Sequence, residues 1–242
     1  MRVATYNVHD CIGRDGVYDP ARIAGVVADL DADVVALQEV TLDHAGDVLA
    51  TLERLTAMRA IDGTLFDRGV GRYGNLLLSR LPVIEQCFHD ISRVGREPRG
   101  VVDTRVEVGG HACRVLATHL GLHMHERRDQ INHLARMVGD HDGPAVLLGD
   151  FNVWLGVAAF GPLRRVGLQA TFVHSFPTWF VPLLALDRIL VREPATLIRH
   201  WRHVETPAVM ASDHFPLVAD LSLHRGEGAK TKPPYDYETF SG

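Results

Sequence analysis

The chain has 242 residues, of which 46% are hydrophobic and 23% are charged, proportions typical of a globular protein that buries one sizeable core. Its 25 basic and 30 acidic residues give a formal net charge of −5, which disfavours a protein that binds nucleic acid mainly through phosphate contacts. No apolar stretch is long enough to span a bilayer, and this excludes a transmembrane helix.

Three segments have the apolar spacing of an amphipathic helix. The first runs from Ile23 to Leu30 and follows Asp19-Pro20, a pair typical of a helix N-terminus. The second runs from residue 45 to 52, and the third from residue 131 to 138. In each segment the apolar residues recur at positions i, i+3, i+4 and i+7, so we predict three helices that each bury one face.

Short apolar runs between these helices predict strands. The best runs are residues 3–8, 34–37, 76–78, 101–108, 113–118, 146–148, 189–191 and 217–223. Several are continuously apolar, as in strands that are buried on both faces. Residues 101–108 alternate instead, which predicts a strand with one polar face. Helices mixed with both types of strand predict a layered α/β domain.

The end of the chain differs in composition from the rest. Residues 224–242 contain little to bury, so we predict a flexible tail behind one domain formed by residues 1–223. The cysteines Cys11, Cys87 and Cys113 are widely spaced and form no CxxC motif, which favours free thiols. No signal-peptide pattern precedes the first strand, and we therefore expect a cytoplasmic protein.

Polar side chains stand at the ends of six predicted strands. These are Asn7 and His9, Gln38 and Glu39, Thr118 and His119, Asp150 and Asn152, Asp187, and the triplet Ser212-Asp213-His214. Each alone is explained as a turn, a helix cap or a buried histidine. Together they place several carboxylates at strand ends, where α/β proteins build sites, and burying them is costly without a cation. Such oxygen ligands favour Mg²⁺ or Mn²⁺ over zinc.

The order and spacing of these motifs, with Gly74-Asn75 and Leu78-Ser79-Arg80 between them, resemble the endonuclease/exonuclease/phosphatase superfamily, the DNase I-like group. The resemblance covers about residues 1–223. It implies an α/β fold, a four-layer sandwich of two packed mixed β-sheets flanked by helices. It also implies divalent-metal-dependent hydrolysis of a phosphate ester.

The resemblance implies a set of metal-binding residues. Glu39 corresponds to the principal metal ligand, and Asn7 lies beside the metal and helps to place it. Asp213 is implied as a ligand, directly or through water. Mg²⁺ is the expected cofactor, and Mn²⁺ is expected to substitute for it.

The resemblance also implies catalytic roles. Asp150 orients or deprotonates the attacking water, and Asn152 donates a hydrogen bond to a phosphoryl oxygen. His214, paired with Asp187, contacts the scissile phosphate. His119 stabilises the phosphorane or protonates the leaving oxygen. An acid paired with imidazole fixes the tautomer of the ring and favours its charged form, which agrees with these roles.

Three further residues are candidates for substrate binding. Arg99 precedes the strand with the polar face and has the fork geometry that holds a phosphate; the alternative is a surface ion pair with Glu97. Asn75 and Arg80 belong to the motifs of the resemblance, and the alternative for Arg80 is a structural role.

Two apolar segments bear on the substrate. Residues 154–160 and 176–184 adjoin the polar motifs and would hold an acyl chain or a lipid surface if they flank the site; the alternative is that both are core. Pro177 and Pro182 indicate that the second segment is a loop. We predict a phosphodiesterase for a small or lipid-derived diester, ahead of a DNA or RNA nuclease and of a phosphomonoesterase. A non-catalytic binding module is the alternative from another class.

Overall fold

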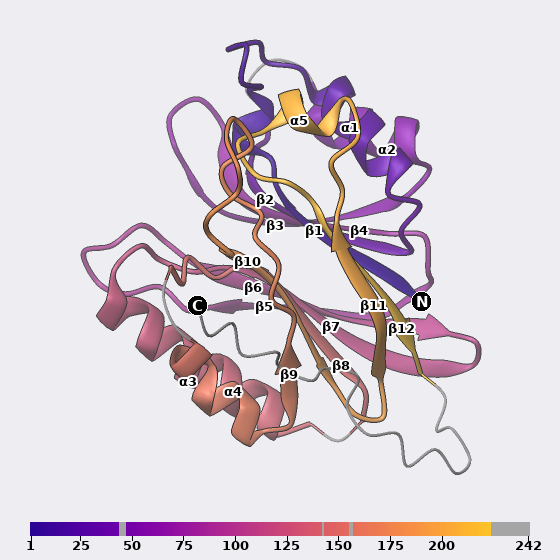
Figure 1. The fold of residues 1–242 in the computed structure, drawn as a ribbon, viewed down its shortest axis with the longest axis vertical. Coiled ribbons are helices and arrows are strands. Elements are labelled where there is room, and N and C mark those ends of the chain that lie inside the picture. Colours follow the sequence, from indigo (N-terminus) through magenta and orange to yellow (C-terminus); the bar gives the residue numbers. More distant parts are fainter. Residues whose placement is uncertain (44–46, 142, 155–156, 224–242) are drawn as a thin grey trace, which may run out of the picture.

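In the computed structural model, which describes residues 1–43, 47–141, 143–154 and 157–223, two six-stranded β-sheets pack face to face. Helices cover the outer face of each sheet, so the layers run helices, sheet, sheet, helices (Figure 1). This is the predicted four-layer α/β sandwich. The predicted tail, residues 224–242, lies outside the described residues. No helix in the described part of the chain is long and apolar enough to cross a membrane.

The first sheet contains both ends of the described chain. Its strands, in spatial order, are β11 (Thr196–Arg202), β12 (Leu217–Ser222), β1 (Arg2–Asn7), β2 (Val34–Thr41), β4 (Arg72–Ser79) and β3 (Arg59–Asp67). β1 and β2 are parallel, and the other neighbours are antiparallel. The helices α1 (Pro20–Asp29), α2 (Val48–Thr56) and α5 (Ala208–Ala211) pack on its outer face.

The second sheet has the same plan. Its strands, in spatial order, are β5 (Val83–Asp90), β6 (Gly100–Val108), β7 (His111–His119), β8 (Ala145–Asp150), β10 (Asp187–Arg192) and β9 (Leu168–Ala170). β7 and β8 are parallel, and the other neighbours are antiparallel. The helices α3 (Met124–Gly139) and α4 (Gly161–Arg165) cover its outer face. Two short 3₁₀ turns, η1 (His9–Cys11) and η2 (Val157–Phe160), complete the elements.

The central strands are buried on both faces, which explains their continuous apolar runs. In β1, Val3 faces the core between the sheets, and its neighbour Ala4 faces the core under α1 and α2. In β2, Ala36 likewise faces the core between the sheets, and Leu37 faces the core under α1 and α2. Three separate hydrophobic cores therefore hold the four layers together.

The eight predicted strands and the three predicted helices are present with shifted ends; residues 45–46 of the second predicted helix lie outside the described residues. Asp19 caps α1 by accepting a hydrogen bond from the Arg22 backbone N–H, as the Asp-Pro pair predicts.

The polar face predicted for residues 101–108 is correct for Arg105, which is exposed, but wrong for Asp103. Asp103 is buried because Arg114 and His89 pair with its carboxylate.

The strand registers bring the predicted polar motifs to one edge of the sandwich. Asn7, the last residue of β1, pairs with Gln38 near the end of β2. Asp150, the last residue of β8, pairs with His119 on one side and with Asp187 on the other. We call this end of the two sheets, together with the loops that join the strands there, the site edge. Its loops are the described residues within 8–19, 42–47, 68–71, 91–99, 120–123, 151–160, 171–186 and 203–216.

Candidate active site

Glu39 reaches the site through a β-bulge. The pairing of β2 with β4 shifts register between Leu37 and Val40, so β2 carries an extra residue at this point. Glu39 there has a left-handed backbone, with φ at 57°, a conformation that costs free energy for any residue except glycine. Bulges of this kind redirect a side chain at the rim of a sheet, and this one turns the Glu39 carboxylate toward Asn7.

Asn7 joins the two central carboxylates of the site. Its Nδ2 donates to Glu39 Oε1 at 3.0 Å and to Asp150 Oδ2 at 3.1 Å. Its Oδ1 accepts a hydrogen bond from the His9 backbone N–H at 3.1 Å. Asn7 is buried, and the contacts of its amide fix the separation of Glu39 and Asp150 across the two sheets. The predicted neighbours Asn7 and Glu39 therefore lie together.

Asp150 depends on a glycine for its position. Gly149 precedes it in β8 with φ at 149°, and a Cβ on this residue would lie 1.8 Å from the Thr118 carbonyl oxygen. Only glycine allows β8 to approach β7 so closely. Asp150 Oδ1 accepts a hydrogen bond from the Asn152 backbone N–H at 2.9 Å. Burial and the charge of Asp187 raise the pKa of Asp150 to about 6.

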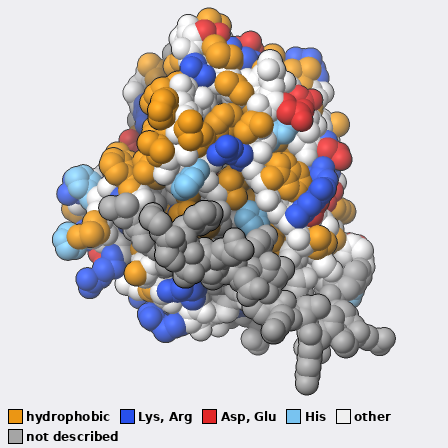
Figure 2. Space-filling view, viewed as in Figure 1, with side chains coloured by type: hydrophobic (Ala, Val, Ile, Leu, Met, Phe, Trp, Pro, Cys, Tyr) orange, Lys and Arg blue, Asp and Glu red, His pale blue; other side chains and the backbone are white. Residues whose placement is uncertain are grey.

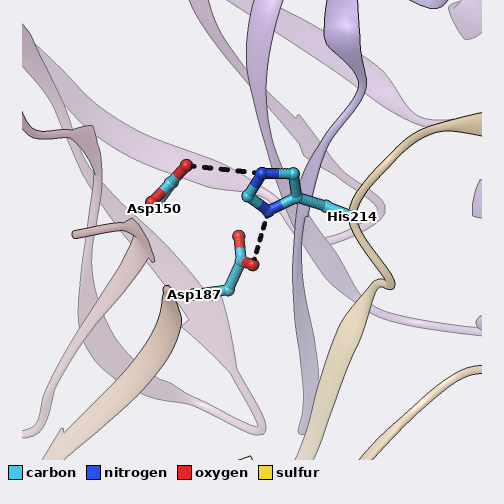
Figure 3. A group of neighbouring side chains, drawn as sticks. All are labelled: Asp150, Asp187 and His214. Carbon is cyan, nitrogen blue, oxygen red and sulfur yellow. Dashed lines mark hydrogen bonds and ion pairs between the residues drawn. The ribbon is translucent and has the colours of Figure 1, made fainter. Parts of the chain in front are cut away.

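Asp187 and His214 form a buried carboxylate–imidazole pair. Asp187 Oδ2 lies 2.8 Å from His214 Nδ1 and also accepts a hydrogen bond from Ser175 Oγ at 2.6 Å. The other ring nitrogen, Nε2, faces Asp150 Oδ2 at 3.9 Å (Figure 3). Burial alone would lower the pKa of His214, but the charge and hydrogen bond of Asp187 raise it to about 10. His214 is therefore an imidazolium at neutral pH.

The surroundings of His119 shift its pKa in the opposite direction from that of His214. Arg99 Nη1 lies 3.2 Å from its Nδ1, and Asn152 Nδ2 lies 3.1 Å from its Nε2. Burial and the charge of Arg99 lower the pKa of His119 to about 3. His119 Nε2 is 3.7 Å from Asp150 Oδ2 and 4.0 Å from Glu39 Oε1. An uncharged ring thus stands beside the two carboxylates.

Arg99 forms the predicted ion pair with Glu97, but not at the surface. Its Nη2 lies 3.0 Å from Glu97 Oε1, and the side chain is buried beside His119. Asn75 is also buried and donates to the Gly100 carbonyl at 3.4 Å, between the two sheets. Both residues lie next to the site.

Arg80 lies away from the site. It follows Ser79, which pairs with the first residue of β2, Val34, at the end of the sheet opposite the site edge. Its Nη1 bonds Asp31 Oδ1 at 2.9 Å, and its backbone N–H donates to Asp33. The structure therefore favours the structural role for Arg80 over substrate binding.

Two residues at the site had no predicted role. His9 Nδ1 lies 3.7 Å from Glu39 Oε2 and 3.9 Å from Asp213 Oδ1. Three consecutive left-handed residues, His9 to Cys11, turn the chain there, and no local pattern in the sequence indicates such a turn.

The second of these residues is Arg68, which lies over the Tyr73 ring, with Cζ 3.2 Å from the ring centroid. The hairpin that carries Arg68 includes β3, a strand absent from the prediction.

Arg68 links two loops of the site edge. Its Nη1 bonds Asp10 Oδ2 at 3.1 Å, and its Nη2 bonds Glu97 Oε2 at 3.4 Å. Glu97 in turn holds Arg99. The turn after β1 is thereby tied to the residue that contacts His119.

Among the described residues, one group has its ligand atoms close enough together to hold a metal ion. Ligand atoms of Asp150, Asp187 and His214 all lie within 4.8 Å of one another. In that group His214 Nδ1 is already occupied by Asp187. The predicted ligands Glu39 and Asp213 are not part of that group; each has a carboxylate oxygen within 4 Å of His9 Nδ1, and Glu39 also contacts Asn7. These hard oxygen donors fit Mg²⁺ or Mn²⁺, and a cation there would offset the charge of the gathered carboxylates.

The second apolar segment, residues 176–184, is an exposed loop beside the site, as the two prolines predict. The Phe176 and His214 rings lie 4.9 Å apart, and the Thr178 backbone N–H donates to the Asp213 carbonyl at 3.0 Å. Phe180, near the centre of the loop, is 65% exposed. In the first segment, residues 154–160, Trp154 is exposed but Phe160 belongs to the core. Residues 155–156 lie outside the described residues.

Residues 4–214 match the Endonuclease/Exonuclease/phosphatase family. The uncharacterized protein YbhP of Escherichia coli (strain K12) is 33% identical over 254 residues, which cover 92% of this chain and 96% of YbhP. Among solved structures, an endonuclease/exonuclease/phosphatase from Beutenbergia cavernae has a TM-score of 0.76 at 24% identity, over 92% of this chain and 71% of that one. The mannosyl-6-phosphatase Bt3783 of Bacteroides thetaiotaomicron has a TM-score of 0.70 at 17% identity, over 92% and 99%. At these identities the two structures establish the fold and not the substrate.

Proposed function

This chain belongs to the endonuclease/exonuclease/phosphatase family, and from that premise we propose that it is an Mg²⁺-dependent phosphodiesterase that uses water to hydrolyse a small or lipid-derived diester. The observation that carries the proposal is the arrangement around Asp150. Asn7 holds its carboxylate between Glu39 and the Asp187–His214 pair. We assign this activity to one catalytic unit, residues 1–223.

The metal-binding part of the proposal rests on Glu39. Its side chain is 25% exposed, while Asn7 donates a hydrogen bond to one carboxylate oxygen from the buried side. We propose that Glu39 and Asp213 hold Mg²⁺, or Mn²⁺ in its place, and that Asn7 sets the position of Glu39. When bound, the ion supplies positive charge to the phosphoryl oxygens as negative charge develops there.

Asp150 is the proposed base. It is buried, it is fixed by Asn7 and by the Asn152 backbone, and its pKa of about 6 leaves it ionised but basic at neutral pH. We propose that it orients the attacking water and accepts its proton. The Asn152 side chain then holds a phosphoryl oxygen with a hydrogen bond, for which it gives up its contact with His119.

The two histidines receive different roles. His214 is charged, and Asp187 holds its Nδ1, which leaves the proton on Nε2 to be donated, so it is the proposed acid that protonates the leaving oxygen. Asp187 is a positioning residue that holds the His214 ring in this tautomer and orientation.

His119 is uncharged and lies between Arg99 and Asn152, so we propose that it contacts the phosphoryl group and does not supply the proton. Arg99 lies behind it and provides positive charge to the substrate phosphate.

The exposed loop of residues 176–184 supports the choice of a lipid-derived diester. This apolar loop adjoins His214, the proposed acid, and Asp213, a proposed metal ligand. A DNA or RNA nuclease is the second candidate, because the family includes such enzymes by name. The net charge of −5 weighs against it. Phosphomonoester hydrolysis, the activity in the name of Bt3783, is the third.

The test compares bis(4-nitrophenyl) phosphate with 4-nitrophenyl phosphate, in Mg²⁺, in Mn²⁺ and in EDTA. We expect the diester to be cleaved faster, EDTA to abolish turnover, and Asp150→Asn to lower kcat by about two decades or more. Faster cleavage of the monoester would support a phosphatase instead. Cleavage of plasmid DNA at a higher kcat/KM than that of a glycerophosphodiester would support a nuclease. No metal-dependent turnover of any of these would favour a non-catalytic binding module.

A further inference from the structure

Exposed hydrophobic side chains are concentrated at the site edge. In the part of the chain that the structure describes, the large exposed hydrophobic residues away from this edge are Leu55, Ile84, Phe88, Leu197 and Ile198. All others lie on the site-edge loops or at the helix ends that adjoin them. Single exposed hydrophobic residues need no explanation, but their concentration around one site does.

The apolar side chains are densest on the loop between β9 and β10. Trp179, Phe180, Val181 and Leu183 are 53–65% exposed, and Trp154 on a neighbouring loop is 61% exposed. Figure 2 shows orange side chains gathered on the upper part of the molecule, over the region where Figure 1 places this loop. The loop is held against the site, because Thr178 bonds the backbone of Ser212 and Asp213.

Three arginines that form no ion pair with a carboxylate among the described residues lie on these loops or at the ends of the elements next to them. Arg14 donates to the Thr178 carbonyl, Arg127 to the Leu122 carbonyl, and Arg202 to the His174 carbonyl. Within the described residues, none of the three forms an ion pair with an acidic side chain. Each therefore places a positive charge without an ion-pair partner among the described residues beside a loop that carries exposed apolar side chains.

We propose that the site edge binds the surface of an anionic phospholipid bilayer, with residues 179–183 and Trp154 in the interface and the arginines at the lipid phosphates. Aromatic and aliphatic side chains next to basic ones are the pattern of a protein that lies on a membrane surface. A symmetric contact with a second copy would bring the arginines of one copy near those of the other and would cover both sites. The inference deepens the proposed function and rests on it, since a lipid-derived diester is reached at such a surface.

The experiment measures co-sedimentation of the full chain with vesicles of phosphatidylcholine alone and of phosphatidylcholine with phosphatidylglycerol. We expect binding to the anionic vesicles that weakens with salt. The double variant Phe180→Ser/Val181→Ser should lose about tenfold or more in affinity, because it removes apolar area from the interface. Arg202→Ala should lose binding to the anionic vesicles only. The matched control, Ile198→Ser, changes a residue of equal exposure to Phe180 on strand β11 and should bind as the unaltered chain does.

Three results would overturn the inference: no binding to either vesicle, equal loss in Ile198→Ser, or a dimer that Phe180→Ser/Val181→Ser converts to a monomer in sedimentation. Turnover of the water-soluble aryl diester separates this inference from the proposed function. We expect the double variant to retain that turnover, because the aryl diester has no acyl chain and neither side chain contacts the proposed catalytic residues. Vesicle binding without any turnover would contradict the proposed function but still support membrane binding by the site edge. Turnover without vesicle binding would contradict only the inference that the site edge binds a membrane.

Discussion

At the scale of single residues, the site separates two histidines by their surroundings. His214 has a carboxylate on one ring nitrogen and a second carboxylate near the other, so its pKa is raised. His119 has a guanidinium and an amide donor against its ring, so its pKa is lowered. Environments that move two similar groups in opposite directions assign them different tasks in acid–base catalysis. This difference leads us to make His214 the acid.

The variant Asp187→Asn tests the pairing with His214. The amide cannot compensate a positive imidazole, so we expect kcat to fall by about two to four decades. The Mg²⁺ affinity should stay the same, because the Asp187 carboxylate is bonded to His214 and Ser175 and is not a proposed metal ligand. Steady-state kinetics and a calorimetric Mg²⁺ titration measure the two quantities. A loss of Mg²⁺ affinity as large as the loss of kcat would show that Asp187 is a metal ligand and not a positioning residue.

The pH dependence of kcat/KM tests both assignments. Asp150 acts in its ionised form, and its raised pKa means that activity is lost as the pH falls through about 6. His214 acts in its charged form, so activity is lost only as the pH rises toward about 10. In Asp187→Asn the alkaline limb should move down toward the ordinary histidine pKa of about 6.5. An alkaline limb that stays in place would contradict His214 as the acid.

Little of this residue detail could be predicted from the sequence. The motifs identify Glu39, Asp150 and His214, because each lies at or near one end of a strand and their order resembles that of the family. The pairing of Asn7 with Glu39 and Asp150 depends on a bulge and on the packing of two sheets, which no local pattern encodes. The contact of His9 with Glu39 likewise depends on three consecutive left-handed residues.

At the scale of elements, the sequence predicts central strands and misses edge strands. The four missed strands, β3, β5, β9 and β11, are the outer strands of the two sheets. Edge strands face solvent, so they lack the continuous apolar runs that reveal β1, β2 and β8. Central strands also carry the site, because their ends are held on both sides by neighbours. The fold class could therefore be predicted, while the order and edges of the sheets could not.

Gly149 is the element-scale position that we expect to tolerate change least. In Gly149→Ala the new Cβ would meet the Thr118 carbonyl at 1.8 Å on a backbone that only glycine adopts readily. We expect a loss of more than about 3 kcal/mol in the free energy of unfolding, measured with urea. The matched variant Gly16→Ala has φ at 73° and no atom within 4 Å of the added Cβ. It should lose only about 1 kcal/mol. Equal losses would mean that β7 and β8 can separate without cost.

At the scale of the whole molecule, the site exists only where the two sheets meet. Glu39 and Asn7 come from the first sheet, and His119, Asp150 and Asp187 come from the second. The packing of Val3, Ala36 and their neighbours against the second sheet therefore sets the separation of the carboxylates. The same architecture directs every loop of the site edge toward one side, where the substrate must approach.

The measurement that tests the central claim most directly is an Mg²⁺ titration of aryl diester hydrolysis, carried out on the unaltered chain and on Glu39→Gln. The claim is that Glu39 holds a divalent ion that the residues around Asp150 need for cleavage of a diester. The account predicts no turnover in EDTA, saturation with Mg²⁺, and a requirement for about tenfold or more Mg²⁺ in Glu39→Gln, because the amide is a weaker ligand than the carboxylate. Equal diester turnover in EDTA and in Mg²⁺, or the same Mg²⁺ requirement in Glu39→Gln as in the unaltered chain, would contradict it.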